Sequence, residues 1–238
     1  MNSKIIEQLA PTGILRAGVS FGNNLLVSAR DASGGPVGVA PDMAAEIAQS
    51  LGVDVEYVLA DRPSGLPEHI ASGACDISFL GADPARADMV AFTPPYCEIP
   101  AAFLVPADST LTVATADTSG TRIASVKAAA YDIWLDGNYH HATLVKGANF
   151  GECLSLLQQG EVDAVAGLRA HLAAVAPEHP SLRLLNEDYM RVQQAVGTAP
   201  GKPEALAYLT SFVETAKQSG LVARLIAKHG VSGLTVAP

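Results

Sequence analysis

The sequence predicts an α/β fold made of two similar lobes, and two patterns lead to this prediction. Short apolar runs rich in β-branched residues alternate with amphipathic segments of helical spacing along the whole chain, which is the element order of α/β domains. In addition, a glycine, two further residues, an aspartate and an apolar run occur at residues 73–78 and again at 160–165. This recurrence is too weak for a solenoid and indicates two lobes of similar construction.

Two extended segments, 99–106 and 192–198, stand where the chain would pass from one lobe to the other and back. Neither has the glycine and serine content of a flexible linker. We therefore expect the first lobe at residues 1–99 together with 197–238, and the second lobe at 103–193. Two strands that cross between the lobes would form a hinge.

The elements of the first lobe follow in order. Residues 15–19 are expected to form a strand, and Pro41 to open a helix whose apolar residues recur every four positions until Gly52 ends it. Residues 53–59 carry the β-branched and aromatic side chains of a second strand, and residues 76–80 those of a short buried one.

In the second lobe, residues 121–126 are expected to form a strand. Asn149, with Glu152 three residues later, predicts a capping box at the start of a helix that Gly160 ends. The C-terminal part predicts two more helices, one from Pro203 to a stop at Gly220 and one from Leu221 to His229.

Composition and charge exclude several classes of protein. Hydrophobic residues make up 49% of the 238 positions and charged residues 16%, so the chain has enough apolar surface to fold, unlike a disordered chain. The formal net charge of −9 and the lack of basic runs argue against nucleic acid and anionic membranes as partners. Since no apolar stretch is long enough to span a bilayer, no membrane insertion is expected.

Three cysteines, Cys75, Cys97 and Cys153, are too widely spaced for a disulfide framework or a zinc site, so buried thiols are expected. The first nine residues contain no long apolar core and no small-residue cleavage site, so they are not an export signal. The protein is therefore expected to be periplasmic, with its signal removed, or cytoplasmic.

Motifs of nucleotide binding and nucleophilic catalysis are missing from the sequence, including G-x-G-x-x-G after a strand, G-x-x-x-x-G-K-[ST] and G-x-S-x-G. His140 and His141 are adjacent, so their side chains diverge and make a poor metal site. Asp42 and Asp132 are expected at helix starts, and His229 as a cation at a helix C-terminus. We predict no cofactor, no metal and no catalysis.

Three segments carry a resemblance to a known family: residues 82–96 with the sequence ADPARADMVAFTPPY, residues 13–19, and residues 38–44, which turn into a helix. In this order they are similar to the bacterial extracellular solute-binding proteins of family 3, the polar amino-acid receptors of ABC importers. The resemblance implies the type II periplasmic-binding-protein fold, in which two Rossmann-like lobes close on a small ligand. It also implies a monomeric substrate-binding protein that captures a carboxylate-bearing solute, an amino acid or a related organic acid, for the transporter's membrane subunits.

In that family the arginine of the turn after the strand receives the carboxylate of the ligand, and by position this arginine is Arg86. A guanidinium group offers a fork of N–H donors that matches a carboxylate. The alternative is a surface arginine paired with Asp83 or Asp88, an arrangement that contributes little to stability.

The resemblance implies further ligand contacts from both lobes. Those of the first lobe come from the loop after the first strand, the turn before Arg86 and the second crossing segment: Phe21, Asn23, Asn24, Gly81, Ala82, Asp83 and Gln193. Those of the second lobe come from a loop that enters a helix and from the end of a strand: Lys127, Ala129, Tyr131, Gly167 and Leu168. Some alternatives stay open, because Phe21 would also suit the core, the two asparagines a turn, and Lys127 a solvated loop.

The chain departs from the family at two places. Phe79 and Gly81 stand where relatives supply hydroxyl and glycine contacts, which leaves the backbone amides of Gly81, Ala82 and Asp83 as donors. The aspartate that holds the ammonium group in the family's amino-acid binders falls on Leu168. Because a buried ammonium group without a partner is costly, we expect an organic acid, such as a dicarboxylate or an acylated amino acid.

Two alternatives from other classes stay open. A lyase or dehydratase on the same fold would need a general acid or base, for which Glu98 is the candidate. A detached ligand-sensing module would share the binding site without transport.

Overall fold

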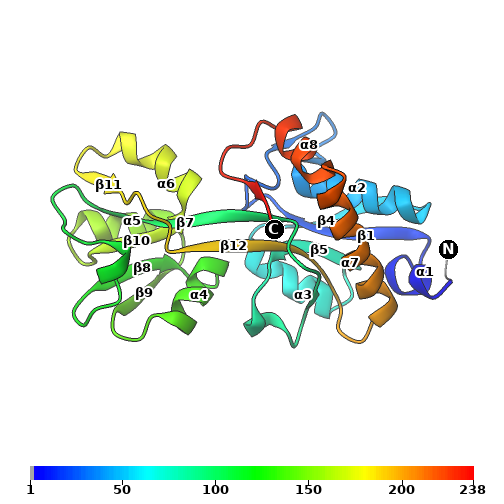
Figure 1. Ribbon diagram of the computed structural model, residues 1–238, viewed down its shortest axis with the longest axis horizontal. Helices are drawn as coiled ribbons and strands as arrows, with labels where there is room; N and C mark the ends of the chain where they lie inside the picture. Colours follow the sequence, from blue (N-terminus) through cyan, green and yellow to red (C-terminus); the bar gives the residue numbers. More distant parts are fainter. Residues whose placement is uncertain (1–2) are drawn as a thin grey trace. The chain divides into compact units, whose positions relative to one another are not determined.

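The computed structural model describes residues 3–238 and confirms the predicted α/β class (Figure 1). The chain divides into two compact units: the first contains the residues up to Glu98 together with Gln193–Pro238, and the second contains Ile99–Val192. Both divisions fall inside strands, because β7 (Cys97–Pro106) and β12 (Met190–Thr198) each continue from one unit into the other. Every helix within residues 3–238 is too short or too polar to cross a membrane.

The first unit contains a mostly parallel sheet in the order β4-β1-β5-β12, in which only β12 runs antiparallel to its neighbour. Apart from the two crossing strands, its strands are β1 (Ile14–Ser20), β2 (Ala29–Arg30), β3 (Pro36–Val37), β4 (Asp54–Ala60), β5 (Ile77–Gly81), β6 (Ala91–Phe92) and β13 (Thr235–Val236). Its helices are α1 (Ser3–Leu9), α2 (Val39–Leu51), α3 (Leu66–Ala71), α7 (Pro203–Gln218) and α8 (Leu221–Lys228), with short 3-10 helices η1 (Pro63–Gly65) and η2 (Pro84–Arg86).

Helix α2 begins at Val39, two residues before the predicted start at Pro41. Gly38 explains the difference: its φ is 155°, and a Cβ atom there would lie 2.3 Å from the carbonyl oxygen of Leu26. The chain can turn into the helix at this position only as glycine, and Pro41 then falls in the first turn, where its missing N–H is not needed. The helix ends as predicted, at Gly52 in the left-handed conformation.

His229 lies at the C-terminal cap of α8, as predicted, and has a partner that the sequence did not indicate. Its Nε2 atom lies 2.8 Å from Oδ2 of Asp42, and the same oxygen accepts the ammonium group of Lys228 at 2.7 Å. Asp42 lies in the first turn of α2, as predicted. His229 therefore ties the end of α8 to the start of α2, in addition to following a helix C-terminus.

The second unit contains strands in the order β7-β10-β8-β9, of which β10, β8 and β9 run parallel. Its strands besides the crossing pair are β8 (Arg122–Val126), β9 (Thr143–Gly147), β10 (Ala164–Leu168) and β11 (Leu182–Leu184). Its helices are α4 (Ala130–Asn138), α5 (Phe150–Gln158) and α6 (Arg169–Val175), with 3-10 helices η3 (Val113–Thr115) and η4 (Ala176–Glu178).

Helix α5 starts at the predicted cap, since the side chain of Asn149 accepts the N–H of Glu152 at 3.0 Å. The second half of the predicted capping box differs, because the Glu152 carboxylate accepts the N–H of Ala148 at 2.7 Å. The carboxylate thus reaches one residue further back and fixes the chain before the cap as well.

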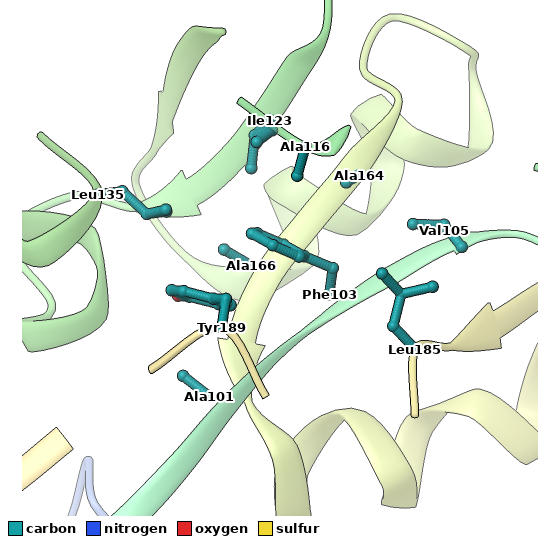
Figure 2. Close-up of a cluster of buried hydrophobic side chains, with 10 residues drawn as sticks. All are labelled: Ala101, Phe103, Val105, Ala116, Ile123, Leu135, Ala164, Ala166, Leu185 and Tyr189. Atoms are coloured by element: carbon teal, nitrogen blue, oxygen red, sulfur yellow. The ribbon is translucent and has the colours of Figure 1, made fainter. Parts of the chain in front are cut away.

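Alternation along β7 divides the core of the second unit into two clusters. Successive side chains of a strand point to opposite faces of the sheet, so Phe103 packs with Leu135 of α4, whereas Leu104 packs with Leu157 of α5. In the first cluster the rings of Phe103 and Tyr189 are stacked, 4.3 Å between centroids (Figure 2). This cluster consists of Ala101, Phe103, Val105, Ala116, Ile123, Leu135, Ala164, Ala166, Leu185 and Tyr189.

All three cysteines are buried and free, which confirms the expectation of buried thiols. Burial raises the pKa of the Cys75 thiol to about 12 and also raises the pKa of Cys97 and of Cys153. The thiolate form that reacts with oxidants and metals is therefore disfavoured at all three positions.

Candidate functional site

In the first unit, the predicted ligand contacts around Arg86 gather at one edge of the sheet. Strands β1 and β5 are parallel neighbours, with Ala17 opposite Ile77 and Gly18 opposite Ser78, so their C-terminal ends lie at the same edge (Figure 1). We call this place the β1/β5 edge. The loops that leave it carry Phe21, Asn23 and Asn24 after β1, and Ala82, Asp83 and Arg86 after β5.

Arg86 is the last residue of η2 and is only 5% exposed. The short helix forms because the side chain of Asp83 caps it, accepting the N–H of Ala85 at 2.8 Å, with Pro84 in the first position. Nη1 of Arg86 donates to the carbonyl oxygen of Gly81 at 2.7 Å. Burial lowers the pKa of the guanidinium, while the charge of Asp83 opposes this shift. The alternative of an exposed surface arginine is therefore wrong.

The backbone amide of Ala82 is engaged in the sheet. It donates to the carbonyl oxygen of Gln193 at 2.7 Å, which corrects the expectation that this N–H is available to a ligand. The side chain of Gln193 donates through Nε2 to Oε1 of Glu98 at 2.9 Å. Phe79 lies in the core, with its ring edge-on to Tyr96 at 5.9 Å between centroids.

The loop after β1 holds Phe21 in a half-buried position, with the guanidinium carbon of Arg30 3.5 Å from the ring centroid. Phe21 is therefore not the core residue that the alternative proposed. The Asn23 N–H closes a turn onto the carbonyl of Ser20 at 3.3 Å, whereas Asn24 is exposed. The turn predicted as the alternative is therefore present at Asn23, and Oδ1 of its side chain is buried without a hydrogen-bond partner among residues 3–238.

In the second unit, the loop that enters α4 uses its own amides. The N–H groups of Lys127 and Ala129 donate to the carbonyls of Gly147 and Val126, at 2.9 and 3.1 Å. The side chain of Lys127 is exposed, and Tyr131 packs against the cluster of Figure 2, where burial raises its pKa. The amides of Lys127 and Ala129 thus hold the loop itself.

The carboxylate of Asp132 holds this loop in place through three contacts. Its buried carboxylate accepts the N–H of Ala128 at 2.9 Å, the hydroxyl of Ser125 and the ammonium group of Lys146. Ala128 has a φ of 62°, the left-handed region that favours glycine. The ion pair and the two hydrogen bonds compensate the burial of the charge and fix a strained turn at the start of α4.

Leu168 ends β10, is half-buried and directly precedes α6. The neighbouring guanidinium of Arg169 is used inside the second unit: it pairs with Asp188 and donates to the carbonyls of Leu185 and Asn186 at 3.0 and 3.1 Å. Gly167 allows close packing, since a Cβ atom there would lie 3.0 Å from the side chain of Leu172. None of these three positions offers a carboxylate to an ammonium group.

Sequence reasoning missed two residues of these sites, Arg30 and Lys146. Both act through partners well separated along the chain, Phe21 and Asp132, so no local pattern marks them. Within residues 3–238 no three His, Cys, Asp or Glu side chains gather as a metal site requires. The backbone N–H groups of His140 and His141 donate hydrogen bonds to the carboxylate of Asp117.

Solved structures of binding proteins share this fold. A mutant of ArgBP from T. maritima is 25% identical, with a TM-score of 0.72 over 96% of this chain and 100% of that one. The solute receptor for L-cysteine of Neisseria gonorrhoeae is 24% identical, with a TM-score of 0.72 over 94% and 93%. An ancestral amino acid-binding protein, described as a precursor of cyclohexadienyl dehydratase, is 21% identical, with a TM-score of 0.69 over 94% and 98%.

These matches confirm the type II periplasmic-binding-protein fold that the sequence predicts. A search of the curated proteins found no match to the sequence. The family profile described as bacterial extracellular solute-binding proteins, family 3, matches residues 20–232. The chain therefore belongs to the bacterial extracellular solute-binding proteins of family 3.

Proposed function

We propose that the protein is the substrate-binding component of an ABC importer and that it captures a small carboxylate-bearing solute through Arg86. The observation that carries the proposal is the buried guanidinium at the β1/β5 edge, with Nη1 on the carbonyl of Gly81. A guanidinium presents its N–H donors in a fixed fork that matches a carboxylate, and burial strengthens the pairing. The solute-binding family supports this assignment.

We expect the solute to lack a free ammonium group, because the protein offers no carboxylate at Leu168 to bind one. Relatives of this fold are named for arginine and for L-cysteine, which supports ligands of amino-acid size. Leu168, however, offers an apolar side chain at the position where the resemblance places the ammonium anchor. We therefore assign an organic acid, a dicarboxylate or an acylated amino acid rather than an ordinary α-amino acid bound through both of its charges.

The remaining parts of the proposal follow from the family. The protein acts as a periplasmic monomer, and the strands β7 and β12 serve as the hinge through which the two units close on the solute. Contacts made only in the closed state stabilise that state, which the membrane subunits then recognise. A detached sensing module would bind the solute in the same way but would not deliver it to membrane subunits, so delivery is what separates the two proposals.

A ligand screen tests the proposal. Amino acids, dicarboxylates, keto acids and acylated amino acids are added to the purified protein, and the midpoint of thermal unfolding is measured. A ligand at a hundred times its Kd adds about 2.7 kcal/mol to the free energy of unfolding, a shift of several degrees. The shift should disappear in Arg86→Gln.

Arg224→Gln is the matched control, because Arg224 is an exposed arginine of α8 whose Nη1 donates to the carbonyl of Ser219. Its ligand response should equal that of the wild type. A response that survives in Arg86→Gln, or silence across the whole panel, would overturn the proposal.

The proposal includes the absence of catalysis. Glu98, the candidate general acid, accepts a hydrogen bond from the side chain of Gln193 on the neighbouring strand, which supports a structural role. Product formation from small hydroxy acids or cyclohexadienyl acids that disappears in Glu98→Gln would favour the dehydratase alternative.

A further inference from the structure

Arg30 covers the aromatic ring that the loop after β1 presents. Its guanidinium carbon lies 3.5 Å from the centroid of the Phe21 ring, and Nη1 donates to the carbonyl of Gly34 at 3.2 Å. A guanidinium over a ring face is attracted by the negative charge of the π-system. One face of Phe21 is therefore occupied by a cation of the protein itself.

The positive charge of Arg30 is not neutralised by an ion pair within the described chain. Its contacts there are the ring and a carbonyl oxygen, although the sequence has 24 acidic residues against 15 basic ones. The nearest acid in sequence is Asp31, and its carboxylate is hydrogen-bonded within its own turn. Oδ1 accepts the N–H groups of Ser33 and Gly35, both at 2.8 Å. Arg30 is thus a held cation without a counter-charge.

The hairpin that carries Arg30 is anchored to the start of α2. Strands β2 and β3 pair Ala29 with Val37, and the preceding segment packs its buried Leu26 against Gly38, with the N–H of Ala40 bonded to the Leu26 carbonyl at 3.0 Å. This anchoring and the ring contact hold the guanidinium beside the loop that leaves β1. Because β1 and β5 end at the same edge, the Phe21 loop that Arg30 contacts and the turn that carries Arg86 both leave the sheet there.

We propose that Arg30 is a specificity-determining residue which selects solutes with a second anionic group. This inference rests on the proposed function, because it takes Arg86 as the receptor of the first carboxylate. By occupying the Phe21 ring, Arg30 denies that face to a cationic or aromatic side chain of the solute. By remaining without a counter-charge, it offers a second carboxylate a guanidinium partner.

The loop also offers a neutral acceptor. Oδ1 of Asn23 is buried and lacks a hydrogen-bond partner among residues 3–238, and buried polar atoms are normally paired. An amide N–H of the solute would satisfy it without adding a positive charge near Arg30. An N-acylated acidic amino acid combines these groups and is therefore a suitable probe.

The test uses pairs of ligands that differ in one charge: N-acetyl-L-glutamate with N-acetyl-L-glutamine, glutarate with glutaramate, and L-glutamate with L-glutamine. Dissociation constants are measured by calorimetry for the wild type and for Arg30→Gln. The wild type should bind the more anionic member at least about tenfold more tightly in each pair that it binds. In Arg30→Gln this ratio should fall to about one, while binding of the less anionic members should be retained.

Two further variants separate charge from packing. Phe21→Leu removes the ring that holds Arg30 and should reduce the ratio without abolishing it, and Arg224→Gln should leave the ratio unchanged. The inference is wrong if Arg30→Gln keeps the wild-type ratio, if it weakens both members of a pair equally, or if the protein binds none of the more anionic probes. If the protein binds only the less anionic members and this binding depends on Arg86, the role of Arg30 is excluded and the proposed function still stands.

Discussion

Arg16 and Asp76 are joined through both the backbone and the side chain of the arginine. Asp76 accepts the backbone N–H and Nε of Arg16 through Oδ2, both at 3.0 Å, and Nη2 through Oδ1 at 2.7 Å. The second unit repeats the arrangement with Arg122 and Asp163, at 2.8, 3.2 and 2.8 Å. In each unit the pair joins a strand, β1 or β8, to the residue before its parallel neighbour, β5 or β10. The recurring Gly-x-x-Asp pattern therefore marks the same structural link in both units.

The two pairs differ in burial, so their removal should differ in cost. The Asp76 side chain is 1% exposed and that of Asp163 is 40% exposed. Asp76→Ala should destabilise the protein by about 2 kcal/mol, because it removes the buried acceptor of three N–H groups of Arg16. Asp163→Ala should cost much less, since exposed pairs are screened by water. Urea unfolding of both variants measures the difference, and equal losses would contradict the burial argument.

The Arg122–Asp163 pair also predicts a pH dependence. The hydrogen bond from Arg122 is the main cause that lowers the pKa of Asp163 in the folded protein. The folded state then binds its proton less readily than the unfolded state, so the contribution to stability is present above the unfolded pKa of about 3.9 and is lost as the pH falls through the folded pKa. Thermal unfolding between pH 6 and pH 3 should show a shallower decline in Asp163→Asn than in the wild type. An identical decline would rule out this group as a cause.

The cysteines should be unreactive while the protein is folded. All three are buried, and the pKa of Cys75 is raised to about 12, so the reactive thiolate is scarce at pH 8. Titration with a chromogenic disulfide reagent should detect almost no thiol in native protein and three thiols per chain after denaturation. Rapid labelling of the native protein would show that one of these thiols is accessible.

Replacing Ala128 by glycine should stabilise the folded protein. An alanine in the left-handed region costs about 1–2 kcal/mol relative to its usual conformation, and Ala128 has a φ of 62°. Ala128→Gly should therefore raise the thermal midpoint. Ala45→Gly, in the interior of α2, is the matched control and should lower the stability by about 1 kcal/mol. A lower midpoint in Ala128→Gly would show that the turn tolerates the alanine without strain.

Leu168→Asp tests the assignment of the ligand class. The residue precedes α6 as its N-cap, a place where aspartate is favoured, so the variant should fold. A carboxylate there should improve the affinity for L-glutamate relative to N-acetyl-L-glutamate by about tenfold, because the free ammonium group gains a charged partner. Calorimetry with both ligands measures the ratio. A folded variant with an unchanged ratio would place Leu168 outside the binding site.

Local patterns were enough to predict the α/β class, the glycine that ends α2 and the first half of the cap of α5, because each depends on residues within one turn or one strand. They were not enough for the start of α2, which depends on the approach of Gly38 to Leu26. The same limit applies to the candidate site. Arg86 could be placed from a turn motif, whereas the contact of Arg30 with Phe21 and the pairing of Asp132 with Lys146 exist only after the chain has folded.

The aromatic cluster of the second unit supplies an optical signal of its own. The sequence contains a single tryptophan, Trp134, which packs against that cluster with its ring centroid 5.6 Å from that of Tyr189. Emission excited at 295 nm therefore originates in the second unit, and the first unit contributes nothing to it. A fluorescence change on adding a solute held by Arg86 would report that binding in one unit is felt in the other, without any label.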